Sequence, residues 1–152
     1  MKEASTPVSS AFEDPNAPLP ESLPFTKDEF IGVVSAFIAN VGPRAKAQGY
    51  SVIFVDLGPE SWEEHLPEAF QELVQKSSVG GVQVRGYSRM IEDGKVFRDK
   101  VTAERGVRFV PGHFSKVATD TFYFTGEWDE AQDKGHFEKH KVIREGMAWK
   151  VL

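Results

Sequence analysis

The chain has 152 residues, a formal net charge of −5 and 40% hydrophobic residues. This size fits one domain with a single core, and the composition is too apolar for a wholly disordered chain. A membrane-spanning helix needs about eighteen consecutive apolar residues, and the sequence has no such run. The absence of cysteine excludes disulfides, thiolate metal sites and cysteine catalysis. The net acidity argues against nucleic acid as a partner.

Residues 1–25 are predicted to form a flexible tail ahead of a single domain over residues 26–152. Five prolines fall in this stretch, and proline both fixes φ and removes a backbone donor. No apolar segment typical of a secretory signal precedes Pro24. The compartment stays open: the protein is cytoplasmic, or it is exported and a signal has been removed.

The first predicted helix begins at a capping box, in which Thr26 caps the helix and Glu29 reaches back to it. Apolar residues follow at helical spacing up to Val41. Gly42-Pro43 is expected to stop or kink this helix, with one more helical turn or a loop after it.

A short buried strand is predicted over Val52–Val55, a β-branched run bounded by glycines. A second capping-box pattern follows at Ser61 and Glu64. Pro67 then suits the first turn of a second helix, whose apolar face includes Phe70 and Leu73.

From residue 82 the hydrophobic period changes to two, which predicts strands. Asp93-Gly94 is the expected turn between strands over 82–91 and 96–102, and Glu145-Gly146 joins 137–144 to 147–152. One further strand is predicted over about 116–128. These registers direct a set of polar and aromatic side chains inward: Ser88, Asp99, Asp120, Phe122, His140 and Trp149.

Helices first and strands afterwards indicate an α+β fold with a curved antiparallel sheet packed against N-terminal helices. This order, and the ending with Gly146, Trp149, Lys150 and Val151, resembles the nuclear transport factor 2-like superfamily. The resemblance implies a cystatin-like cone whose pocket between sheet and helices serves as an enzyme site, a ligand cavity or a core for dimerisation. One departure is that Val52–Val55 has no evident partner strand.

Asp120 and His140 are the candidate catalytic residues, because an inward carboxylate would orient the imidazole and raise its basicity. The alternative is structural: Asp120 pairs with Arg144, and His140 is a core histidine with a backbone acceptor. The candidate ligand-binding residues are Ser88, Asp99, Phe122 and Trp149.

Metal binding is not predicted, although His136, Glu138 and His140 alternate on one strand face and could in principle supply ligands. No phosphate-binding glycine loop or nucleophile elbow is present, and no cofactor is expected. Arg85, Arg89, Arg98 and Lys100 form a predicted basic stripe on the first hairpin. A carboxylate of this chain or of another subunit is expected between the opposed arginines.

The leading functional prediction is a non-catalytic module that binds a small hydrophobic ligand or a protein partner, and that forms a homodimer through its sheet. The alternative is a cofactor-free lyase or isomerase that uses Asp120 and His140 on a small hydrophobic substrate. A cavity filled by Phe122, Phe124 and Trp149 would favour the module, whereas an open one would favour the enzyme.

Overall fold

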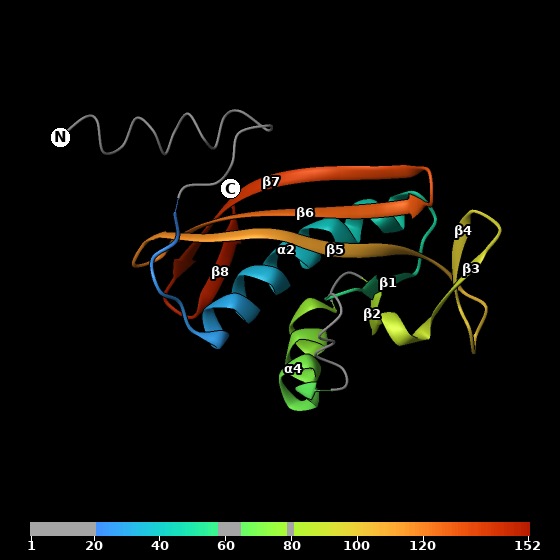
Figure 1. Cartoon of the computed structure of the whole chain (residues 1–152), viewed down its shortest axis with the longest axis horizontal. Helices are drawn as coiled ribbons and strands as arrows, with labels where there is room; N and C mark the ends of the chain where they lie inside the picture. Colours follow the sequence, from blue (N-terminus) through green and yellow to red (C-terminus); the bar gives the residue numbers. More distant parts are fainter. Residues whose placement is uncertain (1–20, 58–64, 79–80) are drawn as a thin grey trace.

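The structure is a computed structural model that describes residues 21–57, 65–78 and 81–152. A strongly curled mixed sheet packs against two helices, which confirms the α+β class (Figure 1). In chain order the elements are α2 (Lys27–Ala47), β1 (Val52–Val55), α4 (Pro67–Ser77), β2 (Gln83–Gly86), the 3-10 turn η1 (Tyr87–Arg89), β3 (Met90–Asp93), β4 (Val96–Asp99), β5 (Arg105–Ala118), β6 (Thr121–Ala131), β7 (Lys134–Glu145) and β8 (Ala148–Val151).

Helix α2 begins at the predicted capping box. The Thr26 hydroxyl accepts from the Glu29 N–H, and a Glu29 carboxylate oxygen accepts from the Thr26 N–H at 2.8 Å. The helix continues through Pro43 to Ala47, so the predicted extra turn is present. The other predicted capping box, at Ser61 and Glu64, lies outside the described residues.

Strand β1 has partners that the sequence did not reveal. It lies between β2 and β5 and pairs with both in parallel, with Val52 opposite Gln83 and Gly106. The sheet is therefore mixed rather than antiparallel throughout. Its path runs β2-β1-β5-β4-β6-β7-β8, and β3 pairs with β4 beside it. The long strands β5, β6 and β7 are antiparallel neighbours.

Both predicted glycine hairpins exist, but each turn lies one residue later than expected. Asp93 pairs with Val96, so Gly94 opens the first loop, and Glu145 pairs with Ala148, so Gly146 opens the second. These glycines have φ of +67° and +64°, while their followers do not have positive φ. That combination is a type II′ turn, which needs glycine only at its first central position.

Two predicted strands are each broken into two elements. The strand predicted over 82–91 becomes β2 and β3, separated by η1. The strand predicted over 116–128 becomes the end of β5 and most of β6, with a two-residue loop at Thr119-Asp120 between Ala118 and Thr121. Side chains in η1 and in that loop therefore leave the alternating pattern of a strand.

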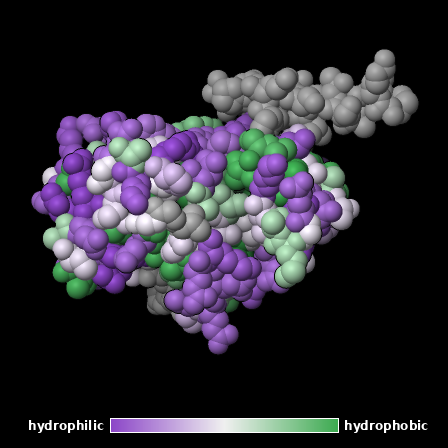
Figure 2. Space-filling model, turned by 180° about the vertical axis from the view of Figure 1, so that it is seen from behind, coloured by the Kyte–Doolittle hydropathy of each residue, from purple (hydrophilic) through white to green (hydrophobic). Residues whose placement is uncertain are grey.

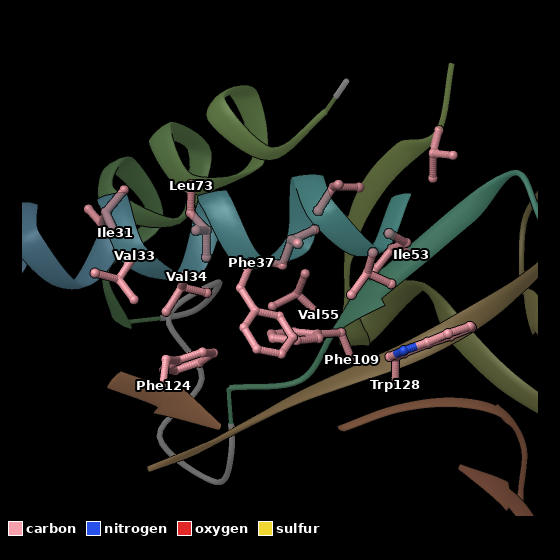
Figure 3. Close-up of a cluster of buried hydrophobic side chains, with 14 of the residues drawn as sticks. Ile31, Val33, Val34, Phe37, Ile53, Val55, Leu73, Phe109, Phe124 and Trp128 are labelled. Carbon is pink, nitrogen blue, oxygen red and sulfur yellow. The ribbon is translucent and has the colours of Figure 1, made fainter. Parts of the chain in front are cut away.

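The core lies between α2 and the concave side of the sheet (Figure 3). Phe37 of α2 contacts Phe109 of β5 and Phe124 of β6, with ring centroids 5.5 and 5.0 Å apart. Leu73 closes this core from α4, and β1 adds Ile53 and Val55. We call the side of β5–β7 that faces α2 the inner face, and the opposite side the outer face.

Candidate functional site

Two predicted site residues do not point into the fold. Ser88 lies in η1 and is exposed, and Asp120 is exposed in the β5–β6 loop. The predicted inward placement of both is wrong, because neither belongs to a strand. Asp120 meets Arg144 through the backbone only: its carbonyl accepts from the Arg144 N–H at 2.9 Å.

Asp99 is buried as predicted, and it is the centre of an ion-pair network. Its carboxylate contacts Arg85 at 2.8 Å and Arg89 at 2.9 Å. Backbone N–H groups of Val101 and Thr102 donate to it at 2.8 and 3.0 Å. Burial alone would raise the pKa of Asp99, but these N–H groups and the two guanidinium groups hold it well below its usual range.

The three arginines of the basic stripe pair with carboxylates of this chain. Arg85 also pairs with Glu104 at 2.8 Å, and Arg98 pairs with Asp93 at 3.0 Å. Arg89 does not lie opposite Arg98, because the partner of Arg98 across the hairpin is Ile91. A stripe occupied by its own carboxylates offers little to the phosphates of a nucleic acid.

The predicted aromatic residues belong to the other end of the sheet. Phe122 is fully buried, and Trp149 is half-buried with its ring 5.3 Å from that of Phe122. Trp149 pairs with Arg144 rather than Val142, so His140 of β7 is not one pair away from it as predicted. The β3–β4 hairpin, which carries Asp99, stands at the opposite end of the molecule from β8 (Figure 1). The four predicted ligand-binding residues therefore do not surround one cavity.

His140 does have a carboxylate partner, but it is Glu138. The imidazole Nε2 is 2.7 Å from Glu138, which also receives two bonds from Arg44 and one from the Trp128 indole. Burial would raise the pKa of Glu138, and these donors hold it well below its usual range. A second pair, His136 and Glu130 at 2.6 Å, lies beside it on the inner face.

These inner-face pairs connect the end of α2 to the sheet. Arg44 comes from the last turn of α2, and the His140 ring lies edge-on to Phe37 at 5.1 Å. Among the described residues, no group of three or more acidic or histidine side chains is arranged to hold a metal ion. The alternating histidines of β7 thus hydrogen-bond to carboxylates, which the strand pattern alone did not distinguish from ligand spacing.

The outer face carries a second cluster that sequence reasoning missed. Arg108 on β5 bonds Asp56 at 2.8 Å, lies 3.5 Å from Asp129 on β6, and packs against the Tyr87 ring. Glu127 stands two residues before Asp129, and its carboxyl group lies close to that of Asp129 over Gly135. Carboxylates at i and i+2 in a strand share a face, and that was the available signal.

A hollow of about 260 Å³ adjoins this cluster on the outer face. Val110, Pro111, Glu127 and Phe137 line it, together with Arg108. Phe137 is 56% exposed, a large apolar surface for a residue in the middle of a strand. A second hollow of about 310 Å³ lies between α2, α4 and the β7–β8 turn, with Trp149 in its wall.

Comparison with protein-family models, with curated proteins and with solved structures returned no match. The resemblance to the nuclear transport factor 2-like superfamily therefore rests on element order and the C-terminal hairpin alone. Neither described helix is long and apolar enough to cross a membrane.

Proposed function

We propose that the chain is a non-catalytic interaction module that self-associates through the outer face of β5–β7. The observation that carries this proposal is the separation of charge along that face. Glu127 and Asp129 stand toward one end, and Lys139 and Lys141 of the neighbouring strand stand toward the other. The partner we infer is a second copy of the chain.

Self-association by a two-fold axis requires a surface that is complementary to itself. Tyr123 lies opposite Lys141, so Lys141 and Glu127 are four residues apart along the sheet, or about 13 Å at 3.3 Å per residue. Rotating one copy by 180° over another places Lys141 of each above Glu127 of the other. Opposite charges then meet twice across the interface, which favours this orientation over others.

An apolar contact accompanies the charges. Phe137 projects from β7 at the level of Glu127 and is largely exposed. Both described helices pack on the inner side, and neither lies over the outer face in the part of the chain that the structure describes (Figure 1). Burying Phe137 in a second copy is worth about 1.5–3 kcal/mol per ring at full burial. Seen from behind the view of Figure 1, the surface of the molecule is mostly hydrophilic, with hydrophobic residues in separate patches (Figure 2).

The space between sheet and helices favours a binding module over an enzyme. Phe37, Phe109, Phe122 and Phe124 are all fully buried there. An acid–base mechanism on His140 would need a carboxylate with spare bonding capacity beside an open cavity. Glu138 instead already serves Arg44 and Trp128, so we do not favour the lyase or isomerase alternative.

A reciprocal charge exchange tests the proposal. Glu127→Lys and Lys141→Glu should each be monomeric, because each puts like charges together at both contacts of a homodimer. Mixed in equal amounts, they should form a heterodimer, since every contact then joins a lysine to a glutamate. Analytical ultracentrifugation of the wild type, the two variants and the mixture gives the answer.

Phe137→Arg provides the apolar arm of the test, with Ile91→Arg as its matched control. Ile91 is 45% exposed on β3, outside the outer face. We expect the first change to abolish association and the second to leave it intact. Ordinary specific complexes have dissociation constants of about 1 μM or tighter. A wild-type protein that stays monomeric at about 100 μM would therefore refute the proposal.

A further inference from the structure

The side chains of Glu127 and Asp129 meet over Gly135. A Cβ atom built on Gly135 would lie 2.4 Å from Asp129 Oδ1 and 3.0 Å from Glu127 Oε2. Gly135 pairs directly with Asp129 across the two strands. Because residue 135 has no side chain, both carboxyl groups can lean into the same space on the outer face.

If both carboxyl groups were ionised, two negative charges would lie side by side. Asp129 Oδ1 is buried and receives no hydrogen bond from any donor in the described residues, although the two carboxyl groups are within hydrogen-bonding contact. A hydrogen bond between two carboxyl groups requires that one of them carry a proton. With one proton the orphaned oxygen has a partner, and with none the two charges repel.

The other charged groups around Glu127 and Asp129 do not neutralise the two carboxylates. From β5, Arg108 reaches Asp129 at only 3.5 Å and makes its shorter bonds to Asp56, which follows β1. From η1, Tyr87 packs on that same guanidinium. From β7, the nearest outer-face residues are Gly135 and Phe137, which carry no charge.

The pKa of Asp129 agrees with this geometry. Burial is the largest cause that raises it, followed by the hydrogen bond and the charge of Glu127, and Arg108 lowers it only in part. The resulting pKa is about 7. The group would therefore exchange its proton near neutral pH rather than near 4.

We propose that the Glu127–Asp129 pair is a receptor for one positive charge: in the isolated chain it holds a proton, and on association the ammonium group of Lys141 from a second copy displaces that proton into solvent. This inference rests on the proposed self-association. It identifies the group that the acidic end of the outer face binds, and it makes assembly depend on pH.

The expected size of the effect follows from linkage. If each pair must lose a proton that it holds with a pKa of about 7, association at pH 6 is about tenfold weaker per pair than at pH 8. A symmetric dimer contains two pairs, so its dissociation constant should rise roughly 100-fold between pH 8 and pH 6.

Two measurements test the inference. The first follows the carboxyl carbon of Asp129 by NMR between pH 4 and 9 in the Lys141→Glu variant, which is monomeric under the proposal. We expect the titration midpoint of Asp129 to lie near 7. When Glu127→Gln is added to this variant, the midpoint should fall, because the glutamine amide can donate to the Asp129 carboxylate. Asp133→Asn is the control, since Asp133 is exposed and pairs with Lys95 instead.

The second measures the dissociation constant against pH by ultracentrifugation for the wild type and for Asp129→Asn. We expect the 100-fold dependence in the wild type, and we expect it to disappear in the variant. Loss of the dependence in Asp129→Asn would assign it to Asp129 rather than to another titratable group of the chain.

The outcomes distinguish this inference from the proposed function. A midpoint below about 5 for Asp129 overturns the shared proton whatever the association state, because it is the ordinary range of a carboxyl group. A midpoint near 7 with pH-independent association overturns displacement by lysine. A midpoint near 7 without association at any pH overturns the proposed function, and the displacement with it, while the shared proton stands.

Discussion

Gly32 shows how one missing methyl group is coupled to a distant aromatic residue. It lies in the first half of α2, and a Cβ at this position would be 2.1 Å from Cε2 and 2.2 Å from Nε1 of Trp149. The indole therefore occupies the place of that side chain. The Trp149 ring centroid lies 5.3 Å from that of Phe122 and 5.1 Å from Cζ of the Arg144 guanidinium.

Two effects of Gly32→Ala oppose each other. Alanine in a helix interior is favoured over glycine by about 1 kcal/mol. Overpacking a filled position costs about 1–3 kcal/mol, and a 2.1 Å approach belongs at the upper end because the whole indole must move. We expect the free energy of unfolding to fall by about 1–2 kcal/mol in the wild-type background.

Removing the obstacle should reverse the sign. In a Trp149→Ala background the new methyl group meets open space, so Gly32→Ala should stabilise by about 1 kcal/mol. Trp149→Ala alone should cost about 2–3 kcal/mol, below the range of about 3–5 for a fully buried tryptophan, because Trp149 is only half-buried.

Equilibrium unfolding in urea, followed by circular dichroism, measures the four proteins of this double-mutant cycle. The diagnostic result is the change of sign between the two backgrounds, not any single free energy of unfolding. If Gly32→Ala stabilised both backgrounds equally, the close packing of the indole on α2 would be refuted.

Three further predictions concern charge and the tail. Asp99→Asn should lower the free energy of unfolding by about 3–5 kcal/mol, because it removes the buried negative charge that faces both Arg85 and Arg89, and Glu104 remains to pair with Arg85 alone. Since the folded-state pKa of Asp99 lies below its unfolded value, this loss should shrink as pH falls below about 4; a constant difference down to pH 2 would contradict the assignment. Asp129→Asn should have the opposite pH dependence, because the folded-state pKa of Asp129 is raised. The free energy of unfolding of the wild type should decline as pH rises from about 4 to 7. Relative to the wild type, the variant should become more stable by up to about 1.4 kcal/mol per pH unit over this range. Removing residues 1–24 should lower the melting temperature by less than about ten degrees, since it costs the Leu23–Lys116 backbone bond but spares the cap at Thr26.

The sequence was informative wherever a local rule decided the structure. The capping box at Thr26 and the β-branched run of β1 were both predicted from neighbouring residues. The hairpins were found as well, but their turns were displaced by one residue. A type I′ turn would have put Asp93 at positive φ, whereas the type II′ turn confines positive φ to Gly94. Both turns keep the same side chains on the same face, so Phe97 and Asp99 were still placed inside.

Long-range pairing was beyond the reach of the sequence. Nothing near Val52 in the chain indicates that its partners are Gln83 and Gly106. Asp120 was placed inward because one strand was assumed where a two-residue loop separates two. The Glu127–Asp129 pair was overlooked since its meaning depends on Gly135, which lies on another strand. Such contacts are set by tertiary packing, which periodicity does not encode.

The position of β1 also has a consequence for how the chain folds. Strands β5 to β8 follow one another through two-residue loops, so their pairings close short loops at little entropic cost. Strand β1 has no such neighbour, and its pairing with β5 joins residues more than fifty positions apart. Contacts of that separation form slowly, because the loop must be ordered before the pairing rewards it. We therefore expect the antiparallel strands to form the folding nucleus and β1 to dock last. In pulsed hydrogen exchange the amides of residues 52–55 should be protected later than those of β6, although β1 is buried throughout in the finished molecule.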